Sequence, residues 1–264
     1  MKQAAEIYKR IGEQKPLVHH LTNWVTISDC AQITRSFGAL PVMAHAIDEV
    51  EEMVGIASAL VLNIGTLTPE LIDSMILAGK AANEKGTPVV LDAVGVGATK
   101  LRTESATKII EEVKVSVLKG NAGEIGVLAG VDAEVRGVES MRVAEESSVI
   151  ASELAGTGEF TVAISGATDV VSDGKRTFLV GNGHKLMGEV VGTGCMAASV
   201  IGSFCAVEKD TSIAATAALA CYGIAGELAS HNARGPGSFK ANLFDEASFL
   251  TTDVINEKIK VTLE

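Results

Sequence analysis

The segment Pro88-Val89-Val90-Leu91-Asp92 is a run of apolar, mostly β-branched residues that ends in an acid. A continuous apolar run of this length predicts a strand that is covered on both faces, as strands of parallel sheets are. Runs of the same kind occur on either side of it, at residues 59–63, 115–118 and 160–164. Longer helical patterns separate these runs, so the sequence predicts repeated βαβ units. We therefore expect an α/β fold with a mostly parallel central sheet and helices on both faces.

The segment between the first two of these strands carries clear helix signals. Thr68 supplies an N-cap, Pro69 occupies the first helical position and Glu70 places an acid in the first turn. Gly86 then closes the helix. We predict a helix between Thr68 and Gly86.

The pattern changes after the fourth strand. Residues 168–180 predict two antiparallel strands joined at Asp173-Gly174, a dipeptide that supplies the positive φ angles of a tight hairpin. Small residues at helical spacing from Gly194 to Val207 and from Thr211 to Ser230 predict two closely packed helices. The second is too weakly apolar for a membrane span, so we expect a buried core helix.

Composition favours one domain over residues 1–264, because no linker, repeat or low-complexity tract interrupts the chain. A hydrophobic content of 47% excludes a disordered chain. The formal net charge is −11 and the basic residues are scattered, which argues against a nucleic-acid or membrane partner.

The cysteines and the N-terminal residues indicate the cellular compartment in which the protein is expected. The four cysteines are far apart and form no Cys-x-x-Cys pair, so we expect reduced thiols in a cytoplasmic protein. Residues 1–15 carry charges throughout and lack the apolar run of a signal peptide. No export is predicted.

Polar residues follow the predicted strands at the point where ligands bind in open parallel sheets. The residues at these strand ends, called strand exits here, are Asn63, Asp92, Lys119 and Ser165. Glycines lie within a few residues of them. Each exit alone is more simply a turn with a helix cap. Together they predict a binding site at one edge of the sheet.

The segment Val191-Gly192-Thr193-Gly194-Cys195 lies directly before a small-residue helix. Glycines in this place leave the first backbone N–H groups of the helix free to face an anion, and the helix dipole favours negative charge there. No Gly-Lys-Ser/Thr of a P-loop, no protein-kinase signature and no Gly-x-Gly-x-x-Gly after a strand occurs. The sequence therefore predicts an anion site outside those three classes.

Taken in order, several motifs resemble the hydroxyethylthiazole kinase family, a branch of the ribokinase-like superfamily. The likeness extends over nearly the whole chain, and it rests on residues 41–44, 63–67, 91–98, 121–124, 181–185, 192–195 and 235–239. The resemblance implies a ribokinase-like fold with an antiparallel hairpin at one edge of the sheet. It also implies ATP-dependent phosphorylation of the hydroxyl of 4-methyl-5-(2-hydroxyethyl)thiazole in thiamine salvage, by a homotrimer with active sites between subunits.

The resemblance assigns the catalytic role to Cys195, which would face the hydroxyl of the thiazole alcohol. A helix N-terminus favours the thiolate, which would help the thiol to act as a base. The simpler alternative is that Cys195 is only a small residue at a helix start. For the thiazole alcohol the resemblance points to Met43, Asn23 and the Gly192 backbone, although Met43 taken alone would more often be a core residue.

For ATP, the resemblance points to Lys119, Ser165, Asn121 and Gly194. Relatives commonly carry Arg and Thr in place of Lys119 and Ser165, and Lys keeps the charge but lacks the bidentate fork of Arg. Ala93 is a further departure, because Pro is usual after the Asp.

Magnesium needs oxygen ligands, and the resemblance offers Glu124 with assistance from Asp92. The plainer interpretation of Glu124 is an acid in the first turn of a helix. The histidines His19, His20 and His45 lie near these segments, but their spacing suggests no metal site, and packing or hydrogen bonding is the expected role.

Three other interpretations stay open. One is a ribokinase-like kinase of another small alcohol, such as the hydroxymethylpyrimidine of the same vitamin pathway. Another is an ADP- or ATP-dependent dehydratase of hydrated NAD(P)H, and the third is a non-catalytic nucleotide-binding protein. The cysteine at the anion site favours the thiazole kinase, and the presence of both Glu124 and Asp92 argues against a catalytically dead module.

Overall fold

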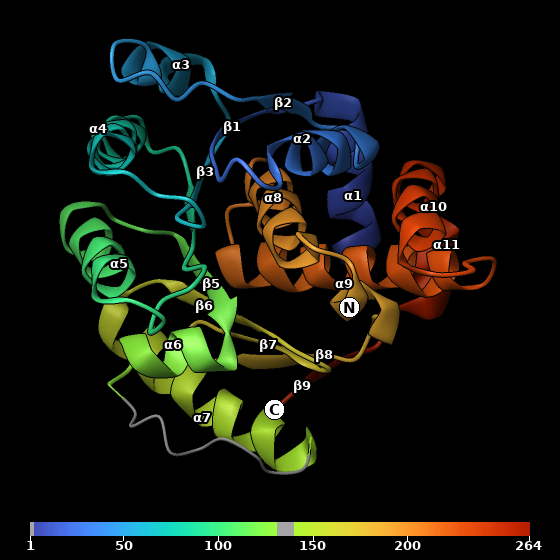
Figure 1. Cartoon of the computed structure of the whole chain (residues 1–264). Helices are drawn as coiled ribbons and strands as arrows, with labels where there is room; N and C mark the ends of the chain where they lie inside the picture. Colours follow the sequence, from blue (N-terminus) through green and yellow to red (C-terminus); the bar gives the residue numbers. More distant parts are fainter. Residues whose placement is uncertain (1–2, 131–139) are drawn as a thin grey trace.

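A computed structural model describes residues 3–130 and 140–264 and has a central mixed sheet with helices on both faces (Figure 1). Within these residues the sheet has nine strands in the order β2-β1-β3-β4-β5-β6-β7-β8-β9. Strands β1 to β6 are paired in parallel, and β7, β8 and β9 continue the sheet by antiparallel pairing. The strands are β1 (Leu17–Leu21), β2 (Leu40–Val42), β3 (Ala59–Asn63), β4 (Val89–Asp92), β5 (Val117–Asn121), β6 (Thr161–Ser165), β7 (Asp169–Ser172), β8 (Thr177–Val180) and β9 (Val261–Leu263).

Helices connect the parallel strands and cover both faces of the sheet. They are α1 (Gln3–Gln14), α2 (Ile27–Ser36), α3 (Val50–Ile56), α4 (Pro69–Lys85), α5 (Lys100–Glu112), α6 (Ala122–Leu128), α7 (Ser140–Gly158), the 3₁₀ helix η1 (Lys185–Glu189), α8 (Thr193–Cys205), α9 (Thr211–Ser230), α10 (Pro236–Phe249) and α11 (Thr252–Lys258). The α/β class and the mostly parallel sheet are confirmed.

The four predicted strands are confirmed, with small shifts of their ends. β3 has the predicted bounds, whereas β5 and β6 begin and end one to three residues later than predicted. Strands β1, β2 and β9 were not predicted as strands. β1 contains His19 and His20, which interrupt the apolar run, and β2 and β9 have only three residues each.

The helix α4 forms as its signals predict. The Thr68 hydroxyl accepts a hydrogen bond from the Leu71 N–H at 3.2 Å, and Pro69 occupies the first turn. Gly86 ends the helix with φ +76°, in the left-handed region. A local cap at each end therefore fixes where this helix lies beside β3 and β4.

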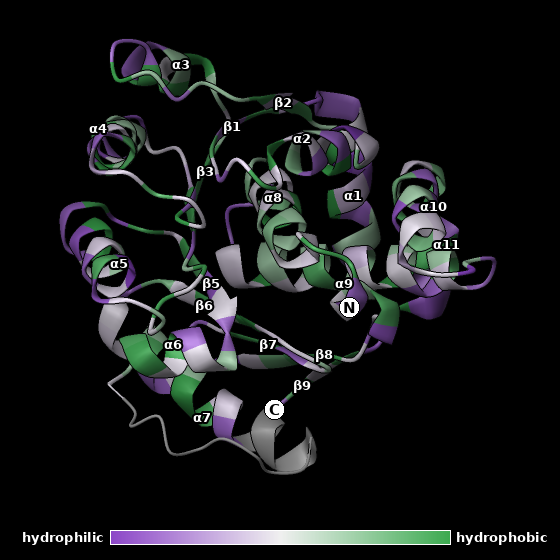
Figure 2. Ribbon diagram, viewed as in Figure 1, coloured by the Kyte–Doolittle hydropathy of each residue, from purple (hydrophilic) through white to green (hydrophobic). Residues whose placement is uncertain are grey.

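Alternate residues of each strand point into two separate apolar cores. Val61 and Val90 pack with α1, α2, α8 and α9 on one face. Leu60, Leu62 and Leu91 pack with α3, α4, α5 and α7 on the other. Figure 2 shows the same division, with α8 mostly green and white and with purple on the outer helices α3 and α5.

Helices α8 and α9 form the core of the first face, as predicted. α9 is the one helix of the described residues that is long and apolar enough to cross a membrane by length and composition, and 83% of its apolar window is buried in the protein. Because α9 packs against α1, α8 and α10, its apolar surface is buried within the fold.

The hairpin of β7 and β8 is confirmed, but its predicted turn is wrong in one respect. Gly174 has φ +80°, whereas Asp173 does not adopt a positive φ angle. Instead, the Asp173 carboxylate accepts hydrogen bonds from the backbone N–H groups of Lys175 and Arg176 at 3.0 and 2.8 Å. The turn is therefore a four-residue loop that is held by a side chain.

Candidate active site

The register of the parallel strands places the predicted polar residues side by side. Asn63 is paired with Asp92 across β3 and β4, and Asp92 with Lys119 across β4 and β5. Asn121 is paired with Ser165 across β5 and β6. The carboxyl edge of four neighbouring strands thus presents one continuous row of polar side chains.

Lys119 and Asp92 form a buried ion pair in this row. Lys119 Nζ donates to Asp92 Oδ1 at 3.1 Å, and the side chains are only 4% and 0% exposed. Asn63 Nδ2 donates to the other carboxylate oxygen at 2.6 Å. Burial raises the pKa of Asp92 to about 6 although Lys119 opposes this. Burial lowers the pKa of the Lys119 ammonium, but the combined attraction of Asp92 and the other acidic groups nearby raises it overall.

A chain of side-chain hydrogen bonds connects this ion pair to Cys195. Asn63 Oδ1 accepts from Asn23 Nδ2 at 2.9 Å, and Asn23 Nδ2 also donates to Cys195 Sγ at 3.3 Å. Three residues named for different roles, Asn23, Asp92 and Cys195, therefore belong to one network. Asn63 was predicted only as a strand exit, yet it joins them.

The surroundings of the Cys195 thiol favour its protonated form. Burial raises its pKa above the ordinary thiol range, and the negative charge of Asp92 raises it further. This direction is opposite to the one expected from the helix N-terminus alone. All four cysteines are free thiols, as predicted.

The start of α8 has the geometry of an anion site. Gly192 has φ +94°, and a β-carbon added there would lie 2.5 Å from Thr26 Cγ2. The first strong intrahelical bond runs from Met196 N–H to the Gly192 carbonyl at 2.8 Å, so the N–H groups of Gly194 and Cys195 precede it. A β-carbon at Gly194 would lie 3.2 Å from Lys119 Nζ. The ammonium thus lies against the opening turn of the helix.

Glu124 is both a helix cap and a member of this edge. One carboxylate oxygen accepts from the Asn121 N–H at 2.8 Å, which completes a capping box with Asn121 at the start of α6. The other oxygen accepts from the Gly95 N–H, also at 2.8 Å. Glu124 is thus an acid in the first turn of α6, and the same carboxylate also fixes the turn after β4.

A pocket of about 680 Å³ brings together three of the residues assigned to ATP. Asn121, Ser165 and Gly194 all line it, beside η1 and the middle of α9, which contributes Tyr222. Tyr222 was not predicted; its hydroxyl donates to the Thr193 carbonyl at 3.1 Å and so supports the turn that opens α8. No pattern in the sequence distinguishes this tyrosine from a core residue.

Met43 and Lys119 do not line that pocket. Met43 is half-buried and directly follows β2, so it also lies at the carboxyl edge of the sheet. Because β2 is the edge strand beside β1, Met43 lies farther from the pocket along this edge than Asn23, which follows β1. Its role in binding the thiazole alcohol remains a prediction. The histidines make hydrogen bonds, as predicted, and His19 Nε2 donates to the Ala44 carbonyl at 2.8 Å.

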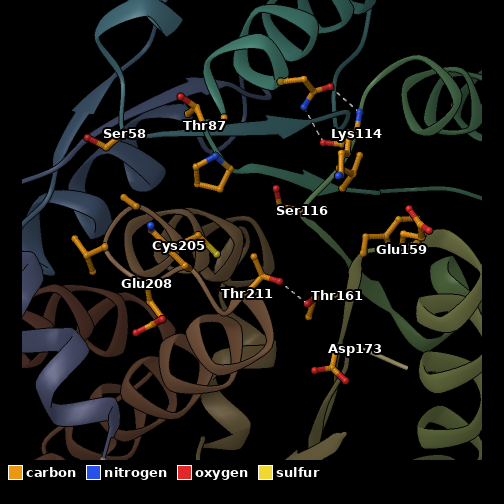
Figure 3. A pocket seen from close by; sticks show the side chains of 18 of the residues that line it. Ser58, Thr87, Lys114, Ser116, Glu159, Thr161, Asp173, Cys205, Glu208 and Thr211 are labelled. Carbon is orange, nitrogen blue, oxygen red and sulfur yellow. Dashed lines mark hydrogen bonds between the residues drawn. The ribbon is translucent and has the colours of Figure 1, made fainter. Parts of the chain in front are cut away.

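A larger cavity of about 1330 Å³ lies at the opposite, amino edge of the strands (Figure 3). Figure 3 shows Ser58, Thr87, Ser116 and Thr161 around it, each at or before the start of a strand. None of the residues predicted for catalysis or binding lines this cavity. The smaller pocket at the carboxyl edge is therefore the candidate active site.

The fold and this edge define a ribokinase-like protein. A solved structure of pyridoxal kinase from Staphylococcus aureus in complex with AMP-PCP matches with a TM-score of 0.64, covering 95% of this chain and 98% of that one. At 14% sequence identity, this likeness shows the fold alone.

Closer relatives identify the family. The model of the hydroxyethylthiazole kinase family matches residues 8–253. Hydroxyethylthiazole kinase of Methanosarcina mazei is 58% identical over 96% of this chain and 97% of the relative, and that of Thermoanaerobacter pseudethanolicus is 56% identical over 98% and 99%. The solved structure of the Pyrococcus horikoshii protein has 45% identity and a TM-score of 0.93 over the whole of both chains. The chain belongs to the hydroxyethylthiazole kinase family.

Proposed function

We propose that this protein transfers the γ-phosphate of ATP to the hydroxyl of 4-methyl-5-(2-hydroxyethyl)thiazole, a salvage step in thiamine synthesis. The observation that carries the proposal is the hydrogen-bonded network from Lys119 through Asp92, Asn63 and Asn23 to Cys195 at the start of α8. It places a cation, open N–H groups and a thiol within one small region. Phosphoryl transfer has a loose transition state, so such positioning and charge stabilisation are the main demands on the enzyme.

Each substrate would then occupy its own part of the carboxyl edge of the sheet. ATP would occupy the pocket lined by Asn121, Ser165 and Gly194, with its terminal phosphate toward the opening turn of α8 and Lys119. The thiazole alcohol would lie on the other side of Cys195, near Asn23 and Met43. The reaction is then an in-line transfer across the N-terminus of α8.

The direct test offers ATP with three acceptors in turn: the thiazole alcohol, the hydroxymethylpyrimidine alcohol and hydrated NADH. We expect rapid phosphate transfer to the thiazole alcohol and little activity on the other two. Preference for the pyrimidine, or ATP-dependent dehydration of hydrated NADH, would favour the corresponding alternative. Nucleotide binding without turnover of any acceptor would favour a binding protein.

Cys195→Ala should lower kcat on the order of 100-fold or more while it leaves KM for ATP nearly unchanged, because only the acceptor hydroxyl loses its base. Cys195→Asp should remain active, because a carboxylate can accept the same proton. Burial raises the pKa of the thiol, so wild-type kcat should rise toward alkaline pH, and this rise should occur at lower pH in Cys195→Asp. Full activity of the alanine variant at all pH values would remove Cys195 from the mechanism.

Magnesium fits the carboxyl edge through Glu124 better than through Asp92. Both Asp92 oxygens are held by Lys119 and Asn63 and the side chain is fully buried, whereas Glu124 accepts only two backbone N–H groups and keeps free lone pairs. The described residues contain no group of three or more metal-binding side chains. A site of one carboxylate with waters and phosphates suits Mg²⁺, which would neutralise charge on the β- and γ-phosphates of ATP.

Glu124→Gln should raise the magnesium concentration needed for half-maximal activity by about 10-fold or more. Glu70→Gln is the matched control, because Glu70 is an exposed acid in the first turn of α4. Titration of activity with magnesium at saturating ATP measures both variants. An unchanged magnesium requirement in Glu124→Gln would exclude this assignment.

We also infer that the enzyme works as a homotrimer with active sites between subunits, in the cytoplasm. We call the part of the edge around Asn23 and Met43 the acceptor region. Large apolar side chains are exposed beside it: Trp24 is 56% exposed, Val25 67% and Ile47 49%. A second copy that covers them would also enclose the thiazole alcohol. Analytical ultracentrifugation should give three times the chain mass of 27.3 kDa, and a monomer would contradict the inference.

A further inference from the structure

Two loops border the acceptor region, and His45 joins them. Thr22 and Asn23 directly follow β1, and Met43 to His45 directly follow β2. His45 Nε2 lies 3.0 Å from the Thr22 backbone nitrogen. The same nitrogen lies 3.2 Å from the Thr22 carbonyl oxygen, so Nε2 either accepts from the Thr22 N–H or donates to the Thr22 carbonyl, according to the tautomer of the ring.

His19 of β1 also holds the loop after β2 in place. This side chain is fully buried in β1, and its Nε2 donates to the carbonyl of Ala44, the residue between Met43 and His45. Burial lowers the pKa of His19, so the ring is neutral. The backbone around Met43 is therefore fixed to β1 on one side, and His45 extends this attachment to the loop that carries Asn23.

The hydrogen bond between His45 and the Thr22 backbone also restrains the next residue, Asn23. Asn23 donates to both Cys195 Sγ and Asn63 Oδ1, so its position relative to the thiol depends on its backbone. That backbone is held on each side, by the His45 bond at Thr22 and by a 2.9 Å bond from the Trp24 N–H to Thr66 Oγ1. The His45 ring also lies against Trp24, with ring centroids 4.9 Å apart.

We propose that His45 is a positioning residue for the acceptor alcohol: its hydrogen bond to the Thr22 backbone fixes Asn23 and Met43 at one separation. This inference rests on the proposed function, because it takes these two residues as the acceptor-binding pair. It requires a hydrogen-bonding group at the end of the side chain of residue 45 and assigns no proton transfer to the imidazole. ATP, which lies on the other side of Cys195, should not depend on it.

The test compares two side chains of nearly equal size. His45→Leu removes the hydrogen-bonding group, whereas His45→Gln carries an amide that can accept from the Thr22 N–H or donate to the Thr22 carbonyl. We expect His45→Leu to raise KM for the thiazole alcohol about tenfold, which is the effect of one lost hydrogen bond, with kcat and KM for ATP within about twofold of wild type. His45→Gln should retain a KM close to that of wild type.

Trp24 allows the same comparison without turnover. It is the only tryptophan of the chain and it contacts His45, so its emission should report binding of the thiazole alcohol in the absence of ATP. The dissociation constant should rise about tenfold in His45→Leu and be restored in His45→Gln. Equal affinity in both variants, or equal losses in kcat and in both KM values, would overturn the positioning role. If wild type neither binds nor phosphorylates the thiazole alcohol, the proposed function itself fails.

Discussion

Lys119→Met is expected to lower the free energy of unfolding by about 3–5 kcal/mol, because it leaves a buried carboxylate without its cation. Lys119 is 4% exposed and Asp92 is fully buried, so water cannot replace the lost partner. Chemical denaturation measured by circular dichroism gives the difference. A loss below about 1 kcal/mol, as is usual for exposed pairs, would contradict the account of this ion pair.

Two further variants separate the charge from the packing. Asp92→Asn added to Lys119→Met removes the unpaired charge, and the double variant should recover most of the lost stability. Lys80→Met breaks the exposed Lys80–Glu112 pair, whose side chains are 51% and 36% exposed, and it should cost less than about 1 kcal/mol. Failure of the double variant to recover would attribute the loss to packing of the lysine stem instead.

The loss in free energy of unfolding caused by Lys119→Met should also depend on pH. Burial already raises the pKa of Asp92 to about 6 with Lys119 present, and loss of the ammonium raises it further. An acid whose pKa is higher in the folded than in the unfolded state loses stability as pH rises from about 3.9 through the folded pKa. The deficit should therefore be greater at about pH 8 than at about pH 5.

Activity should separate from stability in these variants. Lys119 lies against the opening turn of α8, so both the single and the double variant should lose on the order of 100-fold in kcat/KM for ATP. The double variant is then stable but inactive. Recovery of activity together with stability would mean that Lys119 serves only the fold.

The sequence predicts those parts of the fold that have strong local signals. α4 has a cap at each end, and β3 has an unbroken apolar run, so both were located closely. β1 was missed because its two histidines are buried, and each makes a hydrogen bond that only the folded chain supplies. The Asp173 turn was misassigned because Arg176 and Ser212, a residue of a distant helix, help to hold that carboxylate.

The candidate site was predicted as a set of residues but not as a network. Asp92 and Lys119 both end apolar runs, which is a local signal, whereas their pairing depends on β4 and β5 being neighbours in register. The link through Asn63 and Asn23 to Cys195 joins residues 172 positions apart, which no local pattern encodes. The same burial that forms this network raises the pKa of the thiol, contrary to what the helix start alone suggested.

The second large effect is expected for Gly192→Ala, which should reduce kcat/KM on the order of 100-fold or more. Gly192 has φ +94°, and an added β-carbon would lie 2.5 Å from Thr26 Cγ2 and 3.1 Å from Thr26 Cβ. Thr26 cannot move away freely, because its N–H and its hydroxyl both donate to Asn23 Oδ1. Relief of the clash must therefore shift the opening turn of α8 or displace Asn23 from Cys195.

Gly86→Ala is the matched control for this variant, because Gly86 has φ +76° and no atom within 4 Å of an added β-carbon. Both substitutions place an alanine in the left-handed region, at a cost of about 1 kcal/mol, and only Gly192→Ala adds a collision at the anion site. We expect similar thermal stability losses from backbone strain, an additional loss in Gly192→Ala, and near-normal kinetics in Gly86→Ala alone. If Gly192→Ala retained wild-type kcat/KM, the first turn of α8 would not be where the transferred phosphate is held, since that turn cannot keep its geometry with a β-carbon at residue 192.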